Sequence, residues 1–271
     1  MTTPHRLAFS LLLLLLCTCV RAQQPYGAAK SVEKLQGLDD LAAIDQLMYY
    51  IPGIGSASRE ELLRQNIKPY MMPIRQVPQM GMEWAYALAD CLEYYVNLNN
   101  NFKDNLSPDY IAMSLANAGQ RPNLVDGLGL LINSGTVSAA IVPYNSSTIP
   151  NSVYSVARFG INNFGYLFRP ETKARNRVFE TRKALSRGNP VLVELQTDAS
   201  FTDVQGGTYE PTGTGGDETH YLTVIGYDGE AETFELRSSL GRNWGNGGYV
   251  TVSYDDFGEL ARTGYVLIPK E

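Results

Sequence analysis

A histidine and two carboxylates lie next to one another in this 271-residue sequence, where they could exchange protons. Asp217 and Glu218 come just before His220, and an apolar run at residues 221–225 that is typical of a strand follows it. Imidazole and carboxylate groups are the usual side chains of general acid–base catalysis, and two carboxyls across a cleft are what glycoside hydrolysis needs. However, residues 213–216 just before them are rich in glycine, which is typical of a solvated turn.

Glu83 begins a second segment of interest, residues 83–98, in which apolar residues recur at helical spacing. A helix N-terminus stabilises a carboxylate by typically ~0.3–1 kcal/mol, so Glu83 suits the start of a helix. Cys91 follows eight residues later, roughly 12 Å along the helix axis at 1.5 Å per residue. That thiol is predicted to be buried and unreactive in the core. One side of the helix would carry Trp84, Leu88, Cys91 or Leu92, and Tyr95.

The first 22 residues have the pattern of a secretory signal. His5 and Arg6 supply a positive start, residues 7–16 form a short apolar run, and Ala22 ends a small-x-small cleavage site. The apolar run is shorter than the roughly 20 residues that a membrane-spanning helix needs. We therefore expect a secreted or periplasmic protein that does not enter a membrane.

Removal of this leader would leave an acidic protein with one histidine and one cysteine. Arg6 and Arg21 leave with it, so 20 of the 22 basic residues remain against 28 acidic ones, a formal charge of −8. That charge argues against nucleic acid or an anionic membrane as a partner. Cys91 alone forms neither an intrachain disulfide nor a zinc site of Cys and His clusters. We expect no cofactor and no metal ion.

Helical and strand-like patterns are separated along the sequence. Helices first and strands second predict an α+β protein with two lobes. The segment before them, residues 31–65, is polar and helix-prone. Helical patterns cover residues 83–98, 127–133 and 177–187, and strand patterns cover residues 191–195, 221–225, 233–236 and 248–252.

Several segments, taken in order, resemble the papain-like cysteine peptidases. Residues 76–86 resemble the Cys-Gly-Ser-Cys-Trp segment around the catalytic cysteine of that family, and His220 with residues 224–227 resembles the strand of the catalytic histidine. Residues 238–249 are similar to the family's Asn-Ser-Trp-Gly-x-x-Trp-Gly-x-x-Gly-Tyr. Smaller matches lie at residues 106–109, at Gly135 with Pro143 and Tyr144, and at residues 184–193.

The resemblance implies a papain-like fold with a helical lobe at about residues 66–165 and a strand-rich, β-barrel-like lobe at about residues 166–271. Residues 1–22 would be the signal peptide. Residues 23–65 would correspond to a shortened inhibitory propeptide. We expect this extension to be retained, because a protein without activity has nothing to restrain.

The sequence departs from the family pattern at the positions that carry out catalysis in the family. Glu83 stands at the nucleophile position, and a carboxylate cannot replace a thiolate in attack on an amide. The position of the oxyanion-hole glutamine falls on Val77, or on Gln76 or Gln79 if the alignment shifts. The asparagine that orients the histidine is replaced by Ser238.

Other residues of the expected cleft also depart from the family. The paired glycines that hydrogen-bond a peptide substrate fall on Arg121 and Pro122, and Pro122 has no N–H to offer. The remaining residues expected along the cleft are Trp84, Asp217, Glu218 and Trp244.

These substitutions predict a pseudopeptidase that acts by binding or scaffolding a peptide or protein partner. The simplest role for Glu83 and His220 is an ion pair that latches the former active site. The alternative is a repurposed hydrolase that uses Glu83 and His220 as an acid/base pair, with Asp217 or Glu218 as a second carboxylate. A metal site of Glu83, His220 and Asp217 is a further alternative, with similarly little support.

Overall fold

The computed structural model describes residues 37–51, 63–79, 81–101, 103–116, 122–212 and 216–270. The predicted signal peptide with its cleavage site, Arg121, and residues 213–215 of the glycine-rich turn lie outside the described residues. None of the helices in the described ranges is long and apolar enough to cross a membrane.

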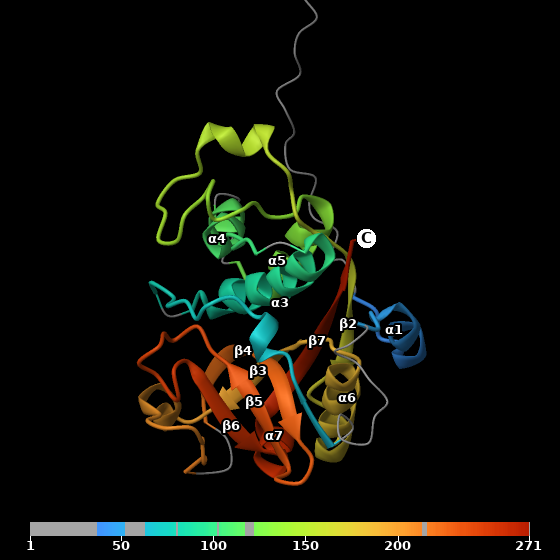
Figure 1. Cartoon of the computed structure of the whole chain (residues 1–271). Helices are drawn as coiled ribbons and strands as arrows, with labels where there is room; N and C mark the ends of the chain where they lie inside the picture. Colours follow the sequence, from blue (N-terminus) through green and yellow to red (C-terminus); the bar gives the residue numbers. More distant parts are fainter. Residues whose placement is uncertain are drawn as a thin grey trace, which may run out of the picture. The chain divides into compact units, whose positions relative to one another are not determined.

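Three helices, α3 (Glu83–Asn100), α4 (Pro108–Ala116) and α5 (Leu124–Asn133), follow one another in the first half of the domain (Figure 1). The Ser107 hydroxyl accepts a hydrogen bond from the Tyr110 N–H at the start of α4, and Asn123 forms a capping box with Asp126 at the start of α5. We predicted one apolar side for α3, but its residues are buried on every side from its start to Tyr95. The reason is that α4 and α5 cover the side that does not face the sheet.

In the part of the chain that the structure describes, seven antiparallel strands form one sheet in the order β2-β7-β3-β4-β5-β6, with β1 also paired to β4. Val191, Val193 and Leu195 lie in one apolar cluster and Leu192 lies in a second one, because successive strand residues point to opposite faces. One cluster contains the α3 side chains, and the other lies against α6 (Ala174–Ser186) and α7 (Tyr254–Leu260). The strands are β1 (Arg64–Asn66), β2 (Ile161–Phe168), β3 (Val191–Thr197), β4 (Glu218–Asp228), β5 (Thr233–Arg237), β6 (Tyr249–Ser253) and β7 (Ala261–Pro269).

Short 3-10 helices also occur in the described ranges. They are η1 (Lys68–Tyr70), η2 (Asn151–Ser155) and η3 (Ala199–Asp203). The arrangement is α+β, as predicted, and the helical patterns at residues 127–133 and 177–187 and all four predicted strands fall on observed elements. The strand patterns missed β1, β2 and β7, and of these β2 and β7 are neighbours in the sheet.

The N-terminal segment at residues 37–51 packs against the sheet and α6. Its helix α1 (Leu41–Leu47) places Ile44, which is fully buried, against Gly165 of β2. Leu38 forms a backbone bridge to Gly165, and Asp45 lies 2.5 Å from the Lys183 ammonium of α6. Part of the predicted propeptide-like extension is therefore built into the apolar core of the domain.

Gly165→Ala is expected to lower the free energy of unfolding by about 1–2 kcal/mol, because a new Cβ would meet Ile44 side-chain carbons at 2.7–2.9 Å. Urea denaturation followed by circular dichroism measures this change, and proteolysis should cut faster within residues 37–51. Gly207→Ala is the matched control, since its Cβ would meet only one atom within 4 Å, at 3.9 Å. Equal stability of the two variants would contradict the packing role of α1.

Candidate functional site

Glu83 and His220 meet at the start of α3. Glu83 is the first residue of that helix, and His220 is the third residue of β4, which packs against α3. The Glu83 Oε2 and His220 Nδ1 atoms are 2.9 Å apart, and the two residues are only 4% and 3% exposed. The fold thus joins two groups that are 137 positions apart in the sequence into one buried pair.

A second carboxylate approaches His220 from its own strand. Glu218 Oε2 lies 3.5 Å from His220 Nε2, and the Glu218 side chain is 44% exposed. Nε2 has no aligned hydrogen bond within the described part of the chain, so we treat this approach as a charge–charge contact. Burial lowers the pKa of His220, but the hydrogen bond to Glu83 and the charges of Glu83 and Glu218 outweigh it, and the net pKa is raised.

The geometry therefore favours a protonated imidazole between two carboxylates. Such an imidazolium neutralises the buried Glu83 carboxylate and can act as a proton donor. A carboxylate that already accepts this hydrogen bond is a weak nucleophile. The arrangement suits an ion pair or an acid/base pair better than covalent catalysis.

Ser238 is not brought into contact with His220. Its hydroxyl accepts a hydrogen bond from the Leu240 N–H at 3.1 Å, and no bond from it to His220 is found among the described residues. A serine side chain is shorter than the asparagine that the family resemblance implies here. The side chain that approaches Nε2 of His220 is Glu218.

Val77 and Gln76 lie along residues 239–241. The Val77 N–H donates to the Ser239 carbonyl at 2.8 Å, and Gln76 forms a backbone bridge to Leu240. The Val77 side chain carries no hydrogen-bond donor, and the Gln76 side chain packs against Gly241. Gln79, the other candidate for this position, is exposed and lies on the rim of a separate cavity.

A cavity of about 340 Å³ is lined by Gln76, Val77 and Trp244 together with loop residues. The Trp244 indole N–H donates to the Phe201 carbonyl at 2.7 Å. The Phe201 ring lies 5.0 Å from Trp244 and 4.7 Å from the His220 ring. Phe201 was not predicted as a site residue, but its ring contacts both Trp244 of this cavity and His220.

A larger cavity of about 910 Å³ borders the start of α3 and contains Trp84 and Pro122 in its lining. Met82 and Gly81, which immediately precede Glu83, also line it. The structure therefore places Trp244 and Pro122, two of the residues predicted for the cleft, in separate cavities. Asp217 is exposed.

Metal binding and a substitute thiol find no support in this geometry. Among the described residues, no group of three or more His, Cys, Asp or Glu side chains is arranged to hold a metal ion. Cys91 is buried, as predicted, with its Sγ 3.6 Å from the Thr223 hydroxyl. Burial raises the pKa of this thiol to about 12, which disfavours the reactive thiolate.

Sequence comparisons agree with the resemblance at the family level. The gamete and mating-type specific protein A of Dictyostelium discoideum is 28% identical over 208 residues, which cover 72% of this chain and 44% of that protein. Cathepsin K of Gallus gallus is 26% identical over 195 residues, and the matched region covers 69% of this chain and 56% of cathepsin K. The chain spans about half the length of these curated relatives.

Solved structures show the same fold. Xylellain, a cysteine protease from Xylella fastidiosa, matches with a TM-score of 0.62 and 17% identity, covering 85% of this chain and 94% of that one. Digestive procathepsin L 3 of Tenebrio molitor matches with a TM-score of 0.65 and 14% identity. That match covers 86% of this chain and 76% of the procathepsin chain. The sequence profile of the papain family cysteine proteases matches residues 63–266, which is most of the chain. The chain therefore belongs to the papain family of cysteine proteases.

Proposed function

We propose that this protein is a secreted papain-family pseudopeptidase, which binds a segment of a peptide or protein partner without cleaving it. The observation that carries the proposal is the 2.9 Å pair of Glu83 and His220. In a thiol peptidase the cysteine beside the histidine performs the attack. Here a carboxylate occupies the partner position of the imidazole, and the Cys91 thiol is buried elsewhere on α3.

Two cavities, one at the start of α3 and one lined by Gln76, Val77 and Trp244, support binding of an extended segment. Ligand sites are typically concave and carry a small number of polar groups that orient the ligand. Both cavities meet this description, since Trp84, Pro122 and Trp244 lie beside the glutamines 76 and 79. The predicted signal peptide supports secretion, and the packing of residues 37–51 supports a retained N-terminal extension.

The purified protein is expected to hydrolyse no member of a fluorogenic peptide panel. Glu83→Cys should be labelled by an epoxide inhibitor of thiol peptidases, because the new thiol would face His220. Glu83→Ser is the matched control, and it should remain unlabelled. Mass spectrometry of the intact protein reads out the adduct. Peptide turnover by the natural sequence that disappears in Glu83→Ala would contradict the proposal.

The alternative function is hydrolysis by Glu83 and His220 as an acid/base pair. The 3.5 Å approach of Glu218 to His220 favours it, because a second carboxylate is then available. A glycan panel tested beside Glu83→Gln and Glu218→Gln distinguishes the two functions. Turnover that both variants reduce by about 10²-fold or more would favour the hydrolase, since general acid–base groups contribute that much.

A further inference from the structure

One side of helix α6 faces away from the core and carries arginine and phenylalanine side chains. Four residues recur on this side at intervals of three or four positions, which is the spacing of one helix face: Arg175, Phe179, Arg182 and Ser186. We call these four residues the α6 face. Ala184 and Leu185, on the other side of the helix, are fully buried in the apolar cluster beneath it.

Neither arginine of the α6 face forms an ion pair with a carboxylate of the described residues. The Arg182 Nε atom is buried without a hydrogen-bond partner among them, and its guanidinium lies 5.3 Å and 5.5 Å from the ring centres of Tyr227 and Tyr254. The neighbouring Lys183 is already neutralised, because its ammonium lies 2.5 Å from the Asp45 carboxylate. The α6 face thus offers two positive charges that no carboxylate in the described part of the chain neutralises.

Phe179 lies between the two arginines and is 62% exposed. A cavity of about 290 Å³ beside its ring is also lined by Arg182, Lys183, Ser186 and Tyr227. A single exposed apolar side chain is ordinary on a protein surface. Here an aromatic ring, two arginines and a cavity occur together, and aromatic residues and arginine are the types enriched at protein–protein interfaces. The composition of the α6 face is therefore that of a docking surface.

The α6 face is separate from the candidate site. Tyr227, which lines its cavity, follows His220 by seven residues on β4, roughly 23 Å along the strand at ~3.3 Å per residue. In addition, α6 and α3 pack against different apolar clusters, which lie on opposite faces of the sheet. A ligand of the α6 face would therefore bind without contacting the Glu83–His220 pair.

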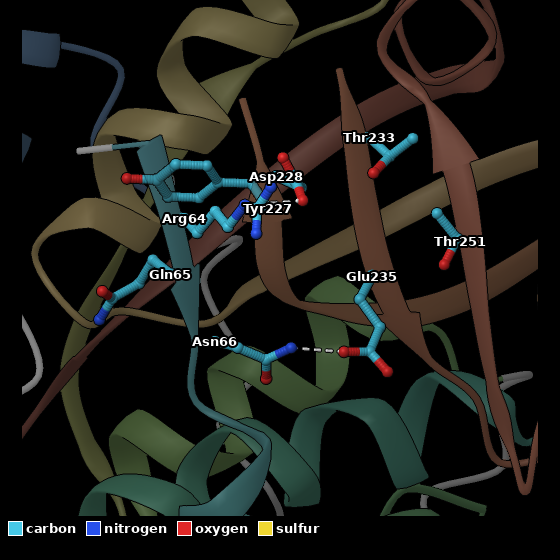
Figure 2. Close-up of a pocket in the computed structure, with 8 residues that line it drawn as sticks. All are labelled: Arg64, Gln65, Asn66, Tyr227, Asp228, Thr233, Glu235 and Thr251. Carbon is cyan, nitrogen blue, oxygen red and sulfur yellow. Dashed lines mark hydrogen bonds and ion pairs between the residues drawn. The ribbon is translucent and has the colours of Figure 1, made fainter. Parts of the chain in front are cut away.

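A groove on the neighbouring part of the sheet provides a contrast. Figure 2 shows this groove, of about 530 Å³, between β1, β4, β5 and β6, with Tyr227 in its lining as well. Its charges are paired within the protein, since Arg64 lies 3.0 Å from Asp228 and Glu235 lies 2.6 Å from Lys68. The groove therefore leaves these charges little to gain from a ligand, whereas the arginines of the α6 face still lack a carboxylate.

We propose that the α6 face binds a protein partner through a segment in which aspartate or glutamate lies next to an apolar side chain. Carboxylates would pair with Arg175 and Arg182, which are roughly 10 Å apart along the helix at 1.5 Å per residue. The apolar side chain would pack on Phe179. Nucleic acid and anionic membranes also carry negative charge, but the formal net charge of −6 opposes such extended polyanions more than a short segment.

Selection of a displayed dodecapeptide library on the purified protein tests this proposal, with Phe179→Ala protein used to remove peptides that bind elsewhere. We expect the enriched peptides to carry aspartate or glutamate beside an apolar residue. Fluorescence anisotropy of a synthesised peptide should show about tenfold weaker binding to Phe179→Ala and about threefold weaker binding to Arg182→Gln. Lys103→Gln, an equal change of charge at an exposed residue, is the matched control and should keep the affinity.

Several outcomes would overturn the proposal. They are the absence of enriched peptides, enriched peptides without this composition, and an affinity that neither Phe179→Ala nor Arg182→Gln changes. Binding of phosphatidylserine vesicles that Phe179→Ala abolishes would assign the α6 face to a membrane instead of a protein. Glu83→Gln should leave the peptide affinity unchanged, and a loss there would place the peptide in the cleft. The α6 face and the proposed function can therefore fail independently.

Discussion

Asp90→Ala is expected to lower the free energy of unfolding by about 3–5 kcal/mol, which is the usual effect of removing one partner from a buried ion pair. Asp90 lies on α3 and is 4% exposed. Its carboxylate accepts from Arg237 of β5 at 2.7 Å and also from Arg75. Both guanidiniums are buried, so the variant would leave two positive charges in the interior, and among the described residues Glu93 is the carboxylate that still contacts one of them.

Guanidinium denaturation followed by circular dichroism measures this loss. Asp255→Ala is the matched control, because that carboxylate is exposed on α7 and its removal should change stability by no more than about 0.5 kcal/mol. A loss below about 1 kcal/mol for Asp90→Ala would mean that water or Glu93 neutralises the two arginines.

The contacts of Asp90 with Arg75 and Arg237 also make the stability of the protein depend on pH. Burial raises the pKa of Asp90, but the charges of Arg237 and Arg75 outweigh it and hold the pKa below its ordinary value. A lowered folded-state pKa contributes stability that is present above the unfolded pKa and lost as the pH falls through the folded one. Acid unfolding should therefore include loss of this contact between α3 and the sheet.

The contact of Glu83 with His220 could be anticipated from the sequence. Helical spacing predicted a helix beginning at Glu83, and the family resemblance then implied that this end faces His220. The periodicity alone could not bring together residues 137 positions apart. The approach of Glu218 was less predictable, because the glycine-rich residues before it suggested a turn, whereas Glu218 begins β4.

Other parts escaped prediction for physical reasons. Most of β7 is buried on both faces, so its apolar run has no alternation, and β2 is interrupted by polar residues and a glycine. Helix α7 carried a usable signal, since Ser253 caps it three residues before Asp256. The sequence carried no signal for the buried ion pairs of Asp90 with Arg75 and Arg237, because only the tertiary fold brings these residues together.

Glu83→Gln is expected to lower the free energy of unfolding by about 1–3 kcal/mol at pH 5, and by less at pH 9. The reason is that the raised pKa of His220 stabilises the folded state through its protonated form. This contribution is fully present below the unfolded-state pKa of about 6.5 and is lost as the pH rises through the folded-state pKa. Urea denaturation at the two pH values measures the difference.

Glu218→Gln provides the comparison within the same site. It faces the other imidazole nitrogen at 3.5 Å, but its side chain is 44% exposed, so solvent screening should hold its effect to no more than about 1 kcal/mol. An NMR titration of His220 should give a larger downward pKa shift for Glu83→Gln than for Glu218→Gln. A stability loss for Glu83→Gln that is the same at pH 5 and pH 9 would contradict an ion pair. It would indicate a neutral hydrogen bond instead, and the latch would then not depend on the proton of His220.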